Sequence, residues 1–247
     1  MIVLKTLKEI ERIRRSNKIV AEILIEMKKQ AKPGVSTLYL NSVANKIIKE
    51  RSAVPGFLHY KGYPFTICAS NNNVVVHGFP DDKLLKDGDI LSVDVGVLLD
   101  KYYGDAAVTI PIGKVSKSSK RLIKVTEECL YLGIEQAIPE NRVGDISNAI
   151  QTHAEKHGYG LVRGYGGHGV GKQLHEDPHI PNIGAKGVGV ALRAGTVIAI
   201  EPMLTEGNSE VFTAKDGWSV TTKDGKNAAH FEHTIVITET GPEILTN

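Results

Sequence analysis

Hydrophobic residues recur at helical spacing near the start of the chain. Thr6-Leu7-Lys8-Glu9 is a capping-box pattern, in which a threonine caps a helix and a glutamate three positions later bonds back to it. The apolar positions that follow lie on one helix face: Ile10, Ile13, Val20, Leu24 and Met27. This pattern predicts a helix that ends near Pro33-Gly34. A second helix is predicted from about Leu38 to Arg51, begun by Ser36 or Thr37.

Strand-like patterning follows the two predicted helices. The segment TICASNNNVVVHG predicts β structure with a polar turn at Asn71 to Asn73. The segments DILSVDVGVLL and YYGDAAVTIPI predict a hairpin that turns near Asp100-Lys101.

Helical patterning returns over residues 118–138 and 146–158, where Asp145 is the expected cap and Gly158 the expected stop. The last third is again strand-rich, at residues 195–204, 211–220 and 230–239. Strands and helices that cluster without strict alternation favour an α+β fold.

Two ten-residue stretches of the chain resemble each other. Residues 85–94 (LKDGDILSVD) align without gaps on residues 192–201 (LRAGTVIAIE). Each has a basic turn, a glycine and a buried strand that ends in a carboxylate, and an HG pair precedes each, at His77-Gly78 and His168-Gly169. Such a match can arise by chance, but the matching acids favour two related halves that face each other across a site.

Composition narrows the class of protein. A chain of 247 residues is compatible with one large domain or two tightly joined halves. A net charge of +2, without a dense basic cluster, argues against a DNA-binding role. Two cysteines outside any CxxC pair suit a reducing compartment. The early charges exclude a signal-peptide pattern, and no apolar run reaches the length of a membrane span, so we expect a cytoplasmic protein.

Four acidic residues lie in strand-like apolar sequence, where a carboxylate is costly unless something compensates it. They are Asp94, Asp105, Glu201 and Glu232, and His168 lies among glycines in GYGGHGVG. A single such acid is more often structural, but four with a histidine indicate a functional cluster. Converging carboxylates repel each other unless cations offset them. An oxygen-rich set with one imidazole suits manganese, iron(II) or cobalt, and a paired-metal site can activate water for amide hydrolysis.

Two further histidines are candidates for donating to a substrate or to an oxyanion: His77 in VVVHGFP and His175 in GVGKQLHEDPH. For each, the alternative is an ordinary loop histidine. No GxSxG elbow occurs and neither cysteine has a catalytic setting, so nothing indicates a protein nucleophile. We interpret the other histidines as ordinary polar residues: His59, His153, His157, His179, His230 and His233.

The sequence resembles the type I methionine aminopeptidases over essentially the whole chain. The resemblance rests on NNNVVVHGFP, DGDILSVDVGVLLDKYYGDAAVT, YGGHGVGKQLHEDP, GTVIAIEPML and DGWSVTTKDGKNAAHFEHTIVI, in family order. It implies the α+β "pita-bread" fold, with two pseudo-symmetric halves around a dinuclear metal site, and a single catalytic domain over residues 1–247. A short bacterial-type enzyme is the best description.

The resemblance implies a role for each metal-ligand candidate. Asp94 would chelate one ion, while Asp105 and Glu232 would bridge two. His168 and Glu201 would hold the other ion. Two divalent ions (cobalt, manganese or iron(II), with zinc possible) would activate a hydroxide that attacks the first peptide bond.

The resemblance also implies roles around the substrate. Glu201 would shuttle a proton, His175 would stabilise the carbonyl oxygen, and His77 would contact the scissile amide and the leaving amine. The methionine side chain would lie in a pocket of Tyr60, Tyr63, Cys68, Trp218 and Phe57. From sequence alone, these aromatic residues could equally fill the core.

Two positions depart from the family pattern. Phe57 stands where bacterial relatives often carry a small residue, commonly cysteine, and Leu174 stands where many carry a larger aromatic. The first substitution would narrow the pocket or its rim, and the second would widen it.

The expected function is removal of the initiator methionine from nascent proteins and peptides whose second residue is small. One alternative is a peptidase acting beside proline, but such relatives carry an additional N-terminal domain, for which the helix near Thr6 leaves no room. The other is a non-catalytic binding protein, but such relatives lose metal ligands. The expected partners are nascent N-termini, with no membrane partner and a monomeric state. A weaker hypothesis is a contact of Lys215, Lys223 and Lys226 with ribosomal RNA.

Overall fold

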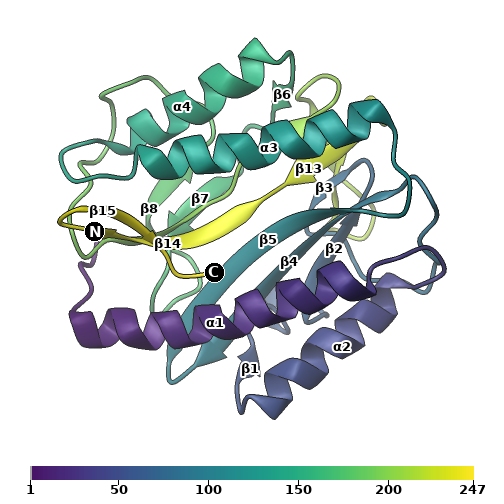
Figure 1. Cartoon of the computed structure of the whole chain (residues 1–247), viewed down its shortest axis with the longest axis horizontal. Coiled ribbons are helices and arrows are strands. Elements are labelled where there is room, and N and C mark those ends of the chain that lie inside the picture. Colours follow the sequence, from purple (N-terminus) through teal and green to yellow (C-terminus); the bar gives the residue numbers. More distant parts are fainter. Residues whose placement is uncertain (1) are drawn as a thin grey trace.

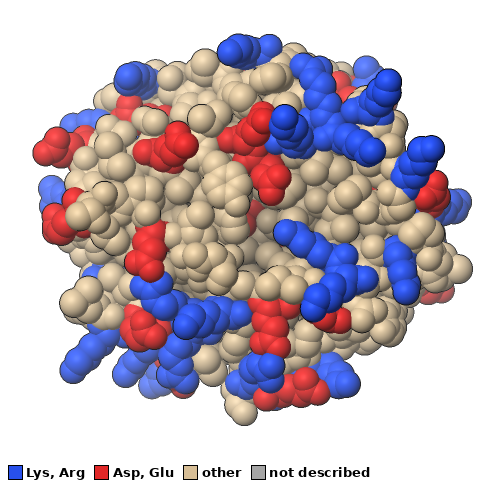
Figure 2. All heavy atoms as spheres, viewed as in Figure 1, with Lys and Arg blue, Asp and Glu red and all other residues tan. Residues whose placement is uncertain are grey.

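The structure is a computed structural model that describes residues 2–247. A large antiparallel sheet forms its centre, and two pairs of helices pack against the sheet (Figure 1). In Figure 1, α1 and α2 lie below the central strands β5 and β14, and α3 and α4 lie above them. One apolar cluster joins all four helices to the sheet, so burial of their apolar faces holds these layers together. Basic and acidic side chains intermix over this face (Figure 2).

All four helices agree with the sequence patterns. They are α1 (Leu7–Gln30), α2 (Thr37–Glu50), α3 (Lys117–Glu135) and α4 (Val143–Lys156). The predicted capping box is confirmed, because the Thr6 N–H donates to Glu9 Oε2 over 3.0 Å and the Glu9 N–H donates to Thr6 Oγ1 over 3.4 Å. Ser36 is the cap of α2, where its hydroxyl accepts from the Tyr39 N–H.

The predicted cap of α4 is wrong. The helix begins at Val143, so Asp145 lies within its first turn rather than before it. Its carboxylate accepts from the Arg142 N–H over 2.8 Å, the reverse half of a capping box. Gly158 does follow the helix, and its φ of +79° ends the helical path.

The strands form one nine-stranded sheet and two three-stranded sheets. The large sheet contains β1 (Val54–Pro55), β2 (Ile67–Asn71), β4 (Ile90–Leu99), β5 (Tyr102–Pro111), β7 (Gly166–Gly169), β8 (Glu176–Pro181), β9 (Val197–Ile200), β14 (Glu232–Thr238) and β15 (Gly241–Ile244). The small sheets contain β6 (Gly160–Leu161), β10 (Met203–Thr205) and β13 (Ala228–His230), and β3 (Val74–Val76), β11 (Val211–Thr213) and β12 (Val220–Thr222). A short 3₁₀ turn, η1, spans Tyr60–Gly62.

The predicted hairpin of β4 and β5 is confirmed, with its turn at Asp100 and Lys101. The segment 195–204 is predicted as a single strand, but it divides at Glu201-Pro202 into β9 and β10. Proline has no N–H to continue a ladder, so the strand breaks where it occurs. The sequence also gives little sign of glycine-rich β7, because glycine has low strand propensity.

The two halves expected from the internal resemblance are confirmed by matching hydrogen bonds. The Gly88 N–H donates to the Ile112 carbonyl over 3.0 Å, and the Gly195 N–H donates to the Ile237 carbonyl over 2.8 Å. Both glycines have a positive φ, +98° and +86°, which suits a residue without Cβ. Aligned residues of the two stretches therefore form the same turn.

The order of helices and strands also matches between the two halves. Each half places two helices before its strands, and the sheet joins β2-β4-β5 to β14-β9-β7, with β5 beside β14 at the middle. Matching isolated bridges tie Ser36 to Leu84 in one half and Arg142 to Ala191 in the other. The carboxylates at the ends of the two resembling stretches thus approach a shared centre.

Candidate active site

The strand register gathers three acidic side chains at the middle of the sheet. Asp94 on β4 and Glu232 on β14 both lie opposite Ala107 of β5. Asp105 is two residues from Ala107 on β5, and residues two apart on a strand share a face. The hairpin that the sequence predicted therefore does bring Asp94 and Asp105 together.

The second half adds a histidine and a fourth acid. His168 lies on β7, which pairs with β9, and Glu201 directly follows β9. His168 Nε2 lies 3.7 Å from Asp105 Oδ2 and 3.7 Å from Glu201 Oε1. One ligand atom from each of Asp105, His168 and Glu232 lies within 4.8 Å of the others. The cluster is therefore compact enough to surround metal ions.

Unpaired oxygen atoms show that this cluster fits cations. Asp94 Oδ1, Asp105 Oδ1 and Glu232 Oε1 are buried without a hydrogen-bond partner. Asp105 and Glu232 are 3% and 2% exposed, so water does not compensate their charge. Divalent cations bound by oxygen atoms would compensate all three, which agrees with the chemistry of this donor set.

The electrostatics of the cluster lead to the same conclusion. Burial raises the pKa of Asp94 to about 7, opposed by His230 and reinforced by Glu201. Burial and neighbouring carboxylates hold the pKa of Asp105 and of Glu232 well above the usual range. Burial also acts to raise the pKa of Glu201, but His230 and His168 outweigh it and lower that pKa.

The candidate metal-binding, catalytic and substrate-binding residues all line one cavity of about 430 Å³. Its lining includes the five proposed metal ligands and, from the remaining candidates, Phe57, Tyr60, Tyr63, Cys68, His77, Leu174, His175 and Trp218. Asp94 and Asp105 come from the first half, while His168, Glu201 and Glu232 come from the second half. Both halves are therefore needed to build this cavity.

His175 and His77 extend the cavity beyond the acidic cluster. The Tyr60 hydroxyl and His175 Nδ1 are 2.9 Å apart, and the rings of His175 and His168 are 4.2 Å apart. Burial and the neighbouring His168 lower the pKa of His175 to about 4. Burial likewise lowers the pKa of His77, which adopts a φ of +60°. Both imidazoles are therefore neutral near pH 7, and each can donate one N–H.

An apolar pocket adjoins the acidic cluster. Phe57, Tyr63, Cys68 and Leu174 form one buried cluster, against which Tyr60, Phe65, Phe79, Tyr103 and Trp218 pack. Cys68 on β2 lies opposite Asp94 on β4, so the apolar pocket and the carboxylates share a wall. Tyr63 is fixed by donating to the carbonyls of Ile67 and Gly78. These aromatic residues therefore pack together, and Phe57, Tyr60, Tyr63 and Trp218 among them also line the cavity.

Phe57 and Leu174, the two departures from the family pattern, meet in this same cluster. A Cβ on Gly96 would lie 2.6 Å from Phe57 Cε1, so the glycine in β4 leaves room for the phenylalanine. A bulky ring at one wall and a smaller side chain at the other thus occupy one pocket.

Sequence reasoning missed one histidine beside the acidic cluster, His230, and several residues that line the cavity. His230 is buried with its Nε2 3.6 Å from Glu201 Oε2, although its sequence context predicts an ordinary polar residue. Its position two residues before Glu232 is a weak signal, because the two residues lie on different strands, β13 and β14. His179 lines the cavity, as do Lys61, Tyr165 and Met203, for which the sequence gives no comparable signal.

Comparison with known proteins identifies the class. The pattern of metallopeptidase family M24 matches residues 11–239, so the chain belongs to this family of metal-dependent peptidases. Methionine aminopeptidase 1 of Bacillus subtilis is 49% identical over 246 residues, covering 100% of this chain and 99% of the relative. Solved methionine aminopeptidases from Thermotoga maritima and Rickettsia prowazekii superpose with TM-scores of 0.99 and 0.98, at 46% and 44% identity, with full coverage of both chains. Within the family, the chain belongs with the methionine aminopeptidases.

More distant structures share the fold alone. A prolidase from Pyrococcus furiosus superposes with a TM-score of 0.82 at 23% identity, and this chain covers 65% of it. The pita-bread architecture is therefore confirmed. Among residues 2–247, no helix combines the length and apolarity needed to cross a membrane.

Proposed function

We propose that this chain removes N-terminal methionine from nascent proteins and peptides whose second residue is small. The observation that carries the proposal is an apolar, aromatic pocket directly beside a compact set of four carboxylates and one imidazole. The pocket suits an unbranched thioether side chain, and the polar set suits hydrolysis of the adjoining amide.

The residues that would hold two divalent ions are Asp94, Asp105, His168, Glu201 and Glu232. When bound, such ions activate water and offset the charge of the tetrahedral intermediate. The oxygen-rich donor set favours manganese, iron(II) or cobalt, and zinc is compatible with it.

The other roles belong to the protein's own side chains. His175 would donate its N–H to the scissile carbonyl oxygen, and Tyr60 orients that imidazole through Nδ1. His77, which also lines the cavity, would contact the scissile amide and the leaving amine. Glu201 would carry a proton to the departing amine, with His230 positioned beside its second oxygen.

We further propose that residues 1–247 act as one catalytic unit, as a monomer in the cytoplasm. Cavity residues from both halves support the single unit. Two buried, unpaired cysteines, Cys68 and Cys129, suit a reducing compartment.

A ribosome contact through Lys215, Lys223 and Lys226 has less support. Lys223 lies 3.4 Å from Glu210, and this local pairing reduces the charge available to RNA. Charge reversal of the three lysines should lower ribosome co-sedimentation, and unchanged co-sedimentation would refute the contact.

The test is cleavage of Met-Ala-Ser, Met-Leu-Ser and Ala-Pro-Ala by chelated protein, before and after adding manganese, iron(II) or cobalt. We expect metal-dependent release of methionine from Met-Ala-Ser alone. Release from Ala-Pro-Ala would instead favour a peptidase acting beside proline. If folded protein cleaves none of the peptides with any metal, the catalytic proposal fails.

A further inference from the structure

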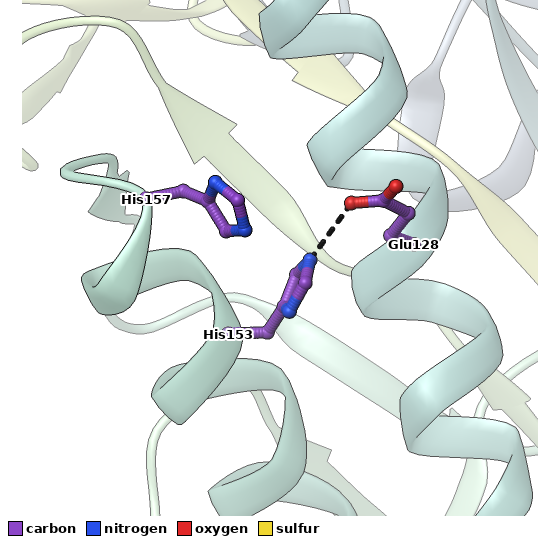
Figure 3. Close-up of side chains that lie close together, drawn as sticks. All are labelled: Glu128, His153 and His157. Carbon is purple, nitrogen blue, oxygen red and sulfur yellow. Dashed lines mark hydrogen bonds and ion pairs between the residues drawn. The ribbon is translucent and has the colours of Figure 1, made fainter.

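A second group of metal-ligating side chains lies between helices α3 and α4. Glu128 extends from α3, and His153 and His157 extend from the last turn and cap of α4 (Figure 3). His153 Nε2 and Glu128 Oε2 are 2.9 Å apart, and the two imidazole rings are 4.6 Å apart. None of the three is among the described residues that line the catalytic cavity.

We propose that Glu128, His153 and His157 form a second metal site, which takes a zinc-like late transition ion and links α3 to α4. Two histidines four positions apart lie on one face of a helix, a spacing that presents both imidazoles to one ion. Glu128 supplies a third ligand from the neighbouring helix, and water completes a tetrahedral shell.

The arrangement needs little movement to bind an ion. One ligand atom from each of the three residues lies within 4.8 Å of the others. Tetrahedral ligands about 2.0–2.1 Å from zinc lie roughly 3.3 Å from one another, a separation that small side-chain rotations would reach. The side chains of His153 and Glu128 are only 20% and 37% exposed, so the helices already restrict their rotamers.

Electrostatics both favour and oppose an ion at this place. The end of α4 carries the negative pole of the helix dipole, and Glu128 adds a formal charge. Against this, Lys124 lies 3.6 Å from Glu128 Oε1, and Arg121 Nη2 lies 3.4 Å from His157 Nδ1. The site is therefore weaker than one without neighbouring cations.

The two centres select different ions because their donors differ. The catalytic cluster has four carboxylates and one imidazole, whereas this site has two imidazoles and one carboxylate. Imidazole favours zinc, copper and nickel, while carboxylate favours manganese. A manganese-loaded catalytic centre can therefore coexist with zinc between the helices.

The experiment measures zinc bound per chain by equilibrium dialysis and metal analysis of chelated protein, with Zn²⁺ alone as the probe. The His153→Ala/His157→Ala double variant should bind one zinc equivalent fewer than the unmodified chain, and manganese-supported peptidase activity should stay unchanged. Glu128→Gln should weaken the binding of this same zinc ion. Glu127→Gln is the matched control, because it removes the same charge one position away. It should leave zinc binding at this site unchanged.

Two further readouts separate ligation from a structural role. Cu²⁺ bound to the unmodified chain should show coupling to two imidazole nitrogens by electron paramagnetic resonance, and the double variant should lose it. Arg121→Gln should tighten zinc binding by roughly fivefold, since it removes a cation close to the ion. If the folded double variant binds as many zinc equivalents as the unmodified chain, the proposal is overturned. If circular dichroism shows that the double variant is misfolded, zinc binding is measured for the single variant His153→Gln instead. That variant should also bind one zinc equivalent fewer, and unchanged zinc binding would overturn the proposal.

Discussion

Single residues divide the cavity into an ion-binding side and a peptide-binding side. On the ion-binding side, buried carboxylate oxygens of Asp94, Asp105 and Glu232 have no hydrogen-bond partners. On the peptide-binding side, His77 and His175 are held neutral by burial and lie beside aromatic rings. Glu201 connects the two sides, because it lies 3.7 Å from His168 and its charge also acts on His77 and His175.

Replacing Glu201 and His175 separately should distinguish these two sides. Glu201→Ala should abolish turnover and weaken metal binding, because it removes a proposed ligand and the proton carrier together. His175→Ala should retain the metal and lower kcat by ~10²–10³-fold, the usual loss for an oxyanion donor. Peptide cleavage and calorimetric metal titration would measure both effects, and equal metal loss in the two variants would contradict the separate roles.

Secondary-structure elements place the site through their ends and register. The β4–β5 ladder sets Asp94 and Asp105 on one face, and the break at Glu201-Pro202 puts a carboxylate at a strand end. Helix α1 packs across both β4 and β5, so its stability supports this ladder. The capping box at Thr6 and Glu9 fixes where α1 begins.

Glu9→Gln should lower the free energy of unfolding in a pH-dependent way. Hydrogen bonds from Thr6 and Tyr102 lower the pKa of Glu9 from 4.5 to about 2. A lowered carboxyl pKa stabilises the fold above the unfolded value, and this contribution disappears as pH falls toward 2. Urea unfolding should therefore show a difference of ~1 kcal/mol or less between the two proteins at pH 7, shrinking steadily below about pH 4.5.

Glu11→Gln serves as the matched control for the capping box. Glu11 lies on the same helix and makes only an exposed contact with Arg14, 3.2 Å away, among the interactions of the described residues. Its replacement should change stability by a few tenths of a kcal/mol at most. If Glu9→Gln lowers the free energy of unfolding by the same amount at every pH, the ionised Glu9 carboxylate is not the source of the difference.

The whole molecule repeats one arrangement of helices and strands around a shared centre. The repeated turn at Gly88 and Gly195 begins the strands that deliver Asp94 and Glu201. Neither half contains the full ligand set, so the cavity exists only when the halves are joined along β5 and β14.

Alanine at the two repeated glycines should be costly to different degrees. Both positions have positive φ, which costs an L-residue ~1–2 kcal/mol. A Cβ at Gly88 would meet no atom within 4 Å, whereas one at Gly195 would lie 3.1 Å from the Lys5 carbonyl oxygen. Gly195→Ala should therefore lower the midpoint of thermal unfolding more than Gly88→Ala. Equal shifts would show that the Lys5 contact adds nothing, and negligible shifts would show that these turns are not conformationally restricted.

The sequence by itself determined local structure and the identity of the candidate ligands. Capping patterns and apolar spacing predicted all four helices, and the acids in apolar strands predicted the carboxylate cluster, because such cues depend on near neighbours. The separate partners of β9 and β10, which pair with β14 and β13, and the strand role of glycine-rich β7 depended instead on long-range pairing. Only the tertiary structure brought His230 against Glu201 and placed Glu128 beside His153. Each of these contacts joins residues far apart in the chain, so local patterns in the sequence cannot predict it.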